Sequence, residues 1–192
     1  MFDLPSFIDD CRTAAGEPDA QERIRGLMED AFRDPDALRH ALRAVDPDGR
    51  NAMLYRSQEL TVLHAVTPAG FVSPIHNHCM WAAIGVLDGA ERNLFYRRTE
   101  SRTGVPTGPD RVAPSDQVVL TPASGIFVLP ADGIHAIRVE GDRAAEGLHV
   151  YGGDLMNQPG RSMWRPDTVE EQSYDYKTLM IWASRMRRGV PL

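Results

Sequence analysis

The segment Pro74-Ile75-His76-Asn77-His78 and the apolar run after it, Cys79 to Leu87, constrain the fold of this chain more than any other stretch. Side chains of an extended strand alternate between two faces, so His76 and His78 point to the same side and can bind one ion. The apolar residues after them occupy both faces as far as the turn at Asp88-Gly89, which is typical of a strand buried on both sides. We therefore expect the histidine pair to face a protein interior.

Two later segments bring further histidines into strands. Pro130-Ala-Asp-Gly133-Ile-His135 is a turn that leads a histidine into an apolar strand, and Gly147-Leu-His149-Val-Tyr151 places three positions on one strand face. An isolated His-x-His pair would be interpreted as two hydrogen-bonded histidines of a loop or core. Because four of the six histidines lie in strand contexts, the sequence favours a metal site.

The remaining two histidines are not expected to bind metal. His40 has arginine and alanine neighbours, which indicates a surface or packing residue. His64 shares a strand face with Leu60, Val62 and Val66, which indicates a core histidine or at most an outer partner of the site.

The length of 192 residues suits a single domain, with a helical segment over 1–48, a β barrel over 49–156 and an extension over 157–192. A net charge of −6 disfavours a nucleic-acid partner, and no apolar stretch is long enough to span a membrane. Cys11 and Cys79 lie far apart in unlike contexts, which disfavours a disulfide. We expect a cytoplasmic monomer or small homo-oligomer.

The order of elements is predicted from periodicity and from turn residues. Apolar spacings of three and four before the turn at Asp46 to Gly49 indicate two or three helices, interrupted at Gly16-Glu-Pro18 and Asp34-Pro35. Evenly spaced short strands then indicate an all-β sandwich or closed barrel. Thr99 to Asp116 is predicted to be a polar surface loop, and Tyr176 to Met186 a helix whose Leu179, Ile181 and Trp182 pack on the barrel.

The order His-x-His, a glycine after the next strand, Pro-x-x-Gly-x-His and a closing strand resembles a cupin, the mainly β double-stranded β-helix or jelly-roll barrel, from about Gly70 to Gly153. Pro74 to Glu91 and the segment Gly147-Leu-His-Val-Tyr-Gly-Gly-Asp154 further resemble the thiol dioxygenases, which comprise cysteine dioxygenase and 3-mercaptopropionate dioxygenase. The resemblance implies one Fe(II) per chain, bound by His76, His78 and His135. It also implies that a small thiol is oxidised to its sulfinate with O2.

The donor set is informative independently of the resemblance. Many cupins supply a carboxylate a few residues after the His-x-His pair, but Ala82 and Ala83 occupy that neighbourhood here. Three neutral imidazoles leave the charge of a divalent metal uncompensated, so such a site attracts anions and favours a thiolate over a thiol. Imidazole ligands suit zinc, copper and nickel as well as iron, so the resemblance alone specifies iron.

His149 and Tyr151 share a strand face, so the histidine is expected to hold the phenol toward the metal as a catalytic pair. In the thiol dioxygenases a serine two residues before this histidine completes a hydrogen-bonded triad, whereas this chain has Gly147. Cys79 directly follows His78 and by alternation faces away from it, so we predict no thioether between Cys79 and Tyr151.

Arginine is well shaped to bind the carboxylate of a substrate. The resemblance points to Arg56, near the position used in cysteine dioxygenases, and to Arg161, near the position used in the mercaptopropionate enzymes. Two other functions remain open at this point. One is a cupin enzyme of different chemistry, such as a dioxygenase that cleaves a dicarbonyl or an isomerase, and the other is a metal-binding module without catalysis.

Overall fold

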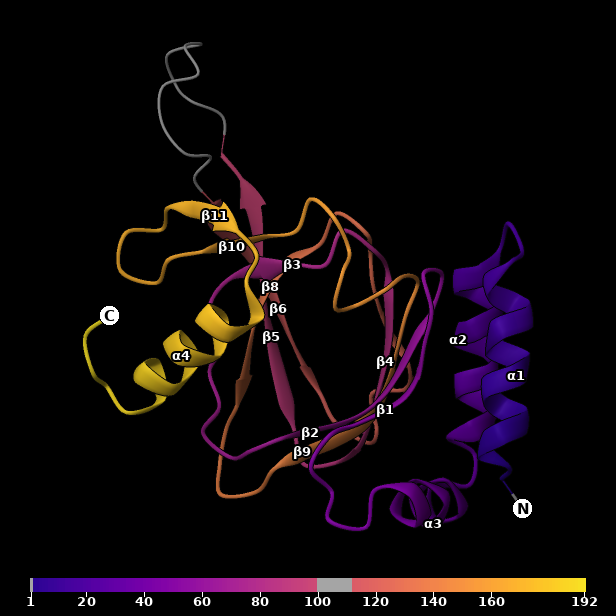
Figure 1. Ribbon diagram of the computed structural model, residues 1–192. Coiled ribbons are helices and arrows are strands. Elements are labelled where there is room, and N and C mark those ends of the chain that lie inside the picture. Colours follow the sequence, from indigo (N-terminus) through magenta and orange to yellow (C-terminus); the bar gives the residue numbers. More distant parts are fainter. Residues whose placement is uncertain (1, 100–111) are drawn as a thin grey trace.

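The computed structural model describes residues 2–99 and 112–192, where the chain forms two antiparallel sheets and four helices (Figure 1). Sheet A has the strand order β1-β2-β9-β4-β7, and sheet B has the order β11-β10-β3-β8-β5-β6. The strands are β1 (Ala52–Arg56), β2 (Thr61–Thr67), β3 (His76–Asn77), β4 (Ala82–Asp88), β5 (Glu91–Arg98), β6 (Val112–Leu120), β7 (Phe127–Leu129), β8 (Ile134–Val139), β9 (Ala145–Tyr151), β10 (Ser162–Trp164) and β11 (Glu171–Ser173).

Successive strands alternate between the two sheets. β2 belongs to sheet A, β3 to sheet B and β4 to sheet A; the hairpin β5-β6 returns to sheet B, and β7 to β10 continue the alternation. Two antiparallel sheets connected in this way form a double-stranded β-helix of the jelly-roll type. This strand order confirms the mainly β, cupin-type fold that the sequence predicted.

Three helices precede the barrel: α1 (Leu4–Ala15), α2 (Ala20–Ala31) and α3 (Pro35–Val45). Local chemistry sets where they begin. The side chain of Asp3 accepts a hydrogen bond from the backbone N–H of Ser6, and the side chain of Asp34 accepts one from Ala37, with a proline in the first turn of both α1 and α3. The predicted breaks between the helices are therefore confirmed.

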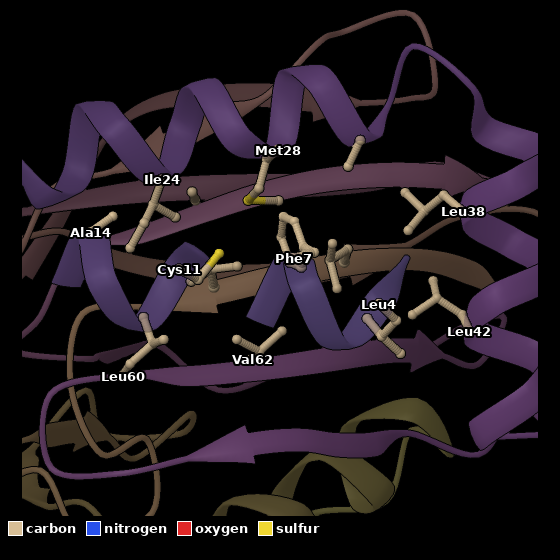
Figure 2. Close-up of a cluster of buried hydrophobic side chains, with 14 of the residues drawn as sticks. Leu4, Phe7, Cys11, Ala14, Ile24, Met28, Leu38, Leu42, Leu60 and Val62 are labelled. Atoms are coloured by element: carbon tan, nitrogen blue, oxygen red, sulfur yellow. The ribbon is translucent and has the colours of Figure 1, made fainter. Parts of the chain in front are cut away.

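Sheet A is covered on its outer face by α1 and α2 (Figure 1). Phe7 of α1 and Met28 of α2 pack in one buried cluster with Val62 of β2 (Figure 2). The opposite face of the sheet carries Ile84 and Tyr151, which belong to a second buried cluster inside the barrel. Because β4 lies between the two clusters, its side chains are buried on both faces, as its continuous apolar run predicted.

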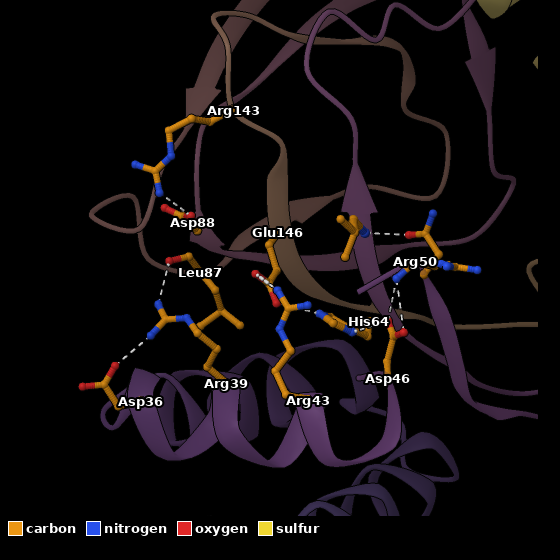
Figure 3. A network of polar contacts seen from close by, with 12 residues as sticks. Asp36, Arg39, Arg43, Asp46, Arg50, His64, Leu87, Asp88, Arg143 and Glu146 are labelled. Carbon is orange, nitrogen blue, oxygen red and sulfur yellow. Dashed lines mark hydrogen bonds and ion pairs between the residues drawn. The ribbon is translucent and has the colours of Figure 1, made fainter. Parts of the chain in front are cut away.

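Polar contacts hold α3 against the same sheet (Figure 3). His64 of β2 is completely buried, which confirms the prediction of a core histidine. Its Nδ1 lies 2.9 Å from Asp46 at the end of α3, and its Nε2 lies 2.9 Å from Glu146 of β9. Arg43 of α3 donates a further hydrogen bond to Glu146 at 2.8 Å. His40, on the same helix, is exposed, as predicted.

The predicted surface loop from Thr99 to Asp116 is wrong at its C-terminal end. Residues 100–111 lie outside the described part of the chain, but β6 already begins at Val112, which pairs with Arg98 of β5. β6 is an edge strand of sheet B, so its polar side chains can remain in solvent. Proline lacks a backbone N–H, but at an edge strand Pro114 does not interrupt hydrogen bonding in the centre of the sheet. The polar composition therefore concealed a strand.

The C-terminal part adds two strands and a helix. β10 and β11 extend sheet B, and Met163 of β10 pairs with His76 of β3. The helix α4 (Tyr176–Arg187) forms where it was predicted. Leu179 is buried in agreement with the prediction, whereas Ile181 is 50% exposed because it lies on the opposite side of the helix from the buried Leu179 and Ala183.

Two further expectations concern the cysteines and membranes. Cys11 is buried and Cys79 is half-buried, and both are free thiols, as expected. No helix within residues 2–99 and 112–192 combines the length and the apolar character that crossing a membrane requires.

Candidate metal centre

Three histidines converge on the inner face of sheet B. His76 of β3 and His135 of β8 are directly opposite each other in the antiparallel ladder, and His78 follows β3 on the same side. The ring centroids are 4.7 Å apart for His76 and His135, 5.0 Å for His76 and His78, and 5.1 Å for His78 and His135. One nitrogen of each ring lies within 4.8 Å of the others, so the group could hold a metal ion.

The protonation state of the three rings suits a metal. Burial lowers the pKa of His76 to about 4 and the pKa values of His78 and His135 well below the usual value, because the interior disfavours an imidazolium. The rings are therefore neutral at pH 7, each with one nitrogen lone pair available. In His76 the Nδ1–H donates to the backbone carbonyl of Pro74 at 3.0 Å, which leaves Nε2 as the ligand atom.

The chemistry of the donors restricts which metals fit. Among the described residues the group contains histidines alone. Ala82 of β4 belongs to the cluster inside the barrel and Ala83 to the cluster under the helices, and neither side chain offers a ligand atom. Neutral nitrogen donors suit ferrous iron, zinc, copper and nickel, and they disfavour magnesium and calcium, which prefer oxygen.

A carboxylate does line the cavity beside the histidines, at a position that the sequence analysis missed. Glu91 of β5 is 2% exposed, and burial raises its pKa to about 6. Its Oε1 accepts a hydrogen bond from Nδ2 of Asn93 at 2.9 Å. Strand alternation from Asn93 would have placed Glu91 on the same face as Asn93. Two polar residues at the start of a strand are, however, normally assigned to its solvent-exposed face.

His149 and Tyr151 face the histidines from sheet A. Nδ1 of His149 lies 3.3 Å from the phenol oxygen of Tyr151, and the Tyr151 ring centroid is 5.3 Å from that of His78. Burial lowers the pKa of His149 to about 4 and raises the pKa of Tyr151 above its usual value. At neutral pH the pair is thus a neutral imidazole and a protonated phenol, and the structure places it beside His78.

Gly147, two residues before His149, sits where the neighbouring strand leaves no space for a side chain. A Cβ atom at this position would lie 2.2 Å from the carbonyl oxygen of Gly85 on β4, which pairs with β9 here. A serine like that of the thiol dioxygenases would therefore require β4 to move. The close contact between the two strands accounts for a glycine at this position.

The sulfur of Cys79 does not line the cavity. The backbone of Cys79 has a φ of 53°, and its Sγ donates to the carbonyl oxygen of Gly160 at 3.3 Å. This orientation agrees with the expectation that Cys79 faces away from His78.

Only one of the two predicted arginines lies at the cavity. Arg161, which is 6% exposed, donates to the backbone carbonyls of Asn77 and Leu155 and stacks on Tyr174, with its guanidinium carbon 3.5 Å from the ring centroid. Its Nη2 lies 3.3 Å from Nδ1 of His78.

Arg56 is engaged elsewhere. Its guanidinium forms a bidentate pair with Asp154, with distances of 2.7 and 2.9 Å, and Arg56 is absent from the residues that line the cavity. The structure therefore does not bring Arg56 to the cavity, and Asp154 neutralises and orients its side chain.

His76 and His78 line a cavity of about 230 Å³. The polar part of its lining also includes Glu91 and Tyr151. Its apolar part includes Leu179 and Met180 of α4. A cavity of this kind, apolar with a few convergent polar groups, is typical of a small-molecule site.

No model of a known protein family matches the sequence. Similar solved structures include the cupin domain of Schizosaccharomyces pombe Cnp3, which is 14% identical over 54% of this chain and 60% of that chain, with a TM-score of 0.41. Hydroquinone 1,2-dioxygenase from Sphingomonas sp. TTNP3 is 12% identical over 55% of this chain and 66% of that chain, with a TM-score of 0.39.

The DMSP lyase DddQ from Ruegeria pomeroyi DSS-3 is 21% identical over 69% of both chains, with a TM-score of 0.40. The chain thus covers less than two thirds of the Cnp3 and hydroquinone dioxygenase chains. Similarity at this level assigns neither an activity nor a substrate. The strand order of the two sheets and the convergence of His76, His78 and His135 inside them identify a cupin-type barrel with a candidate metal centre.

Proposed function

We propose that the protein is an Fe(II)-dependent thiol dioxygenase that converts a small carboxylate-bearing thiol, such as 3-mercaptopropionate or cysteine, to its sulfinate. In the overall reaction one thiolate and one O2 give one sulfinate, so that both oxygen atoms end on sulfur, which is oxidised by four electrons. The observation that carries the proposal is the grouping of three neutral histidines, two of which line a cavity together with the His149–Tyr151 pair and a buried arginine.

The donor set supports an anionic sulfur ligand. Three neutral imidazoles leave the full positive charge of a divalent ion in place, and this charge lowers the pKa of a coordinated thiol. A ferrous ion bound by His76, His78 and His135 would supply open positions at which thiolate and O2 meet, which is a gain from proximity. Tyr151, which burial keeps protonated, would offer its hydroxyl as a hydrogen-bond donor beside that position.

Arg161 supports a carboxylate on the substrate. Its described contacts are two backbone carbonyls, one imidazole and one phenol ring, so no described carboxylate neutralises its charge. A buried guanidinium without a negative partner is costly, and an anionic ligand would remove that cost. The stack on Tyr174 holds the guanidinium plane, which leaves less side-chain entropy to lose on binding.

An oxygen electrode tests the activity directly. Protein purified without oxygen and loaded with Fe(II) is mixed with 3-mercaptopropionate, cysteine, cysteamine or mercaptosuccinate, and the product mass is measured. We expect oxygen uptake only with thiol, in a one-to-one ratio to sulfinate, and none from His76→Ala. Equal oxygen uptake without thiol, or uptake without sulfinate, would point to another cupin chemistry. Absence of turnover with any thiol would favour a metal-binding module.

The arginine is tested by comparing substrates with and without a carboxylate. A hydrogen bond to a charged group contributes about 1.5–3 kcal/mol, so Arg161→Ala should raise the KM for 3-mercaptopropionate roughly 10- to 150-fold. The KM for cysteamine, which has no carboxylate, should change little. Arg56→Ala is the matched control, since Arg56 is paired with Asp154 and should leave both KM values near wild type. The reverse result would transfer the carboxylate contact to Arg56.

A further inference from the structure

A row of buried polar side chains lies behind one of the three histidines. Glu91 and Asn93 are two residues apart on β5, and His135 of β8 is the diagonal neighbour of Asn93, whose direct partner is Ile137. All three side chains point inward, and their exposed fractions are 2%, 0% and 1%. Asn93 bridges the other two: its Nδ2 is 2.9 Å from Glu91 Oε1, and its Oδ1 is 2.8 Å from His135 Nδ1.

The chemistry of these groups gives the chain of hydrogen bonds a direction. An ionised carboxylate has only acceptors, so the amide of Asn93 must present its nitrogen to Glu91 and its oxygen to His135. The amide oxygen can only accept, so Nδ1 of His135 must carry the hydrogen. The remaining nitrogen, Nε2, is then left with its lone pair, and this is the atom that lies 3.0 Å from Nε2 of His78.

The burial of Glu91 is otherwise costly. Its described hydrogen-bond partner is the neutral amide of Asn93, and no described arginine or lysine pairs with it. A carboxyl group taken out of water without a cation reduces stability. A group that has this cost and also determines the orientation of Asn93 is more readily explained by a role at the site than by a role in folding.

We propose that Glu91 and Asn93 are positioning residues of the metal centre. Glu91 orients the amide of Asn93, and Asn93 holds His135 as the Nδ1–H tautomer with Nε2 directed at the metal position. The backbone carbonyl of Pro74 fixes the tautomer of His76 in the same way. For His135 the acceptor is a side chain of β5, which a substitution can remove. The inference rests on the metal centre of the proposed function and not on the thiol or on O2.

Metal affinity and tautomer are the two readouts, with Zn(II) as a redox-inert probe. Loss of such an outer hydrogen-bond partner typically weakens metal binding about 10- to 100-fold. We therefore expect Asn93→Leu to bind Zn(II) about 10- to 100-fold more weakly in a competition titration. In long-range ¹H–¹⁵N spectra of the metal-free protein, the His135 ring should change from the Nδ1–H form to a mixture. Asn93→Asp keeps an oxygen that accepts from His135, and its carboxyl group can share one proton with Glu91, so this variant should keep the Nδ1–H form.

Glu91→Gln tests the first link with a side chain of nearly the same shape. A glutamine can donate to or accept from Asn93, so the amide is no longer oriented, and we expect a mixed tautomer with a smaller loss of Zn(II) affinity. Arg92→Ala is the matched control, because Arg92 points to the opposite face of β5 and contacts Glu140 and Gln117. It should leave both readouts unchanged.

Three results would overturn the proposal or separate it from the proposed function. A folded Asn93→Leu variant with wild-type affinity and an unchanged tautomer would overturn it, and if that variant does not fold, the same result in Glu91→Gln would do so. If the predicted shifts appear but the wild-type iron protein consumes no O2 with any thiol, the proposed function fails and the positioning role stands.

Discussion

At the scale of single residues, Gly147 shows how a neighbouring strand limits which side chains fit beside the candidate metal centre. Gly147→Ser places a Cβ against the Gly85 carbonyl, so β4 must shift. Overpacking of this kind costs about 1–3 kcal/mol. We expect the free energy of unfolding, measured in urea, to fall by that amount, and the turnover to fall with it because β9 also carries His149 and Tyr151.

Gly26→Ser is the matched control for this substitution. Gly26 lies in α2, and an added Cβ has no heavy atom within 4 Å. Serine is a better helix former than glycine, so this variant should be as stable as wild type or slightly more stable. If Gly147→Ser kept wild-type stability and turned over faster, the prediction would be wrong: β4 would have moved, and the serine would assist the His149–Tyr151 pair.

The residues that the structure brings together as expected differ in kind from those that the sequence analysis missed or misplaced. The three histidines stand out because imidazoles are rare and because strand alternation and turns place them on one side. Glu91 and Asn93 were missed because polar residues on a strand are normally assigned to solvent, and only the diagonal pairing with His135 shows otherwise. Arg56 was expected at the cavity, but no pattern indicates that Asp154 pairs with it.

At the scale of elements, a buried histidine of sheet A connects the C-terminal end of α3 to the sheet. His64 bridges the carboxylates of Asp46 and Glu146 (Figure 3), and its removal leaves two buried carboxylates without their shared partner. A buried group that loses its hydrogen-bond partner costs about 1–3 kcal/mol, and Arg43 still compensates Glu146 in part. We expect His64→Ala to lower the free energy of unfolding by about 3 kcal/mol in urea.

His40→Ala provides the comparison for His64→Ala, because His40 is an exposed histidine of α3 and its loss should change stability by no more than about 0.5 kcal/mol. Equal effects of the two substitutions would show that the bridge contributes nothing. The burial of His64 was predicted from strand alternation. Its partners were not, since they lie 18 and 82 residues away in the sequence and no periodicity connects them.

At the scale of the whole molecule, alternation and turn spacing predicted the β barrel and the helices before it. β10 and β11 were missed because strands of three residues carry too little periodicity to be recognised. They form only by adding to sheet B, and Met163 pairs directly with His76. A segment without a local signal thus borders the candidate metal centre.

The buried histidines also make the stability of the whole molecule depend on pH. The pKa values of His76 and His149 are about 4 in the folded protein, against 6.5 for an exposed histidine. Between these values the unfolded chain binds more protons, so stability falls as the pH decreases, by up to about 1.4 kcal/mol per pH unit for each imidazole. His78 and His135 change in the same direction.

Glu91 opposes this trend, because its pKa is raised to about 6 in the folded protein. As the pH decreases, the folded state binds this proton at a higher pH than the unfolded state, which stabilises the fold. One carboxyl group, however, offsets the destabilisation from only one imidazole. For the metal-free protein, kept so by a chelator, we expect the free energy of unfolding measured by urea denaturation to fall steadily from pH 6.5 to pH 5. Zn(II) should raise stability at pH 7 and lose this effect on acidification, since protons compete for the ligand nitrogens. His149→Gln should reduce the slope, and a stability independent of pH over this range would show that the rings are accessible to water.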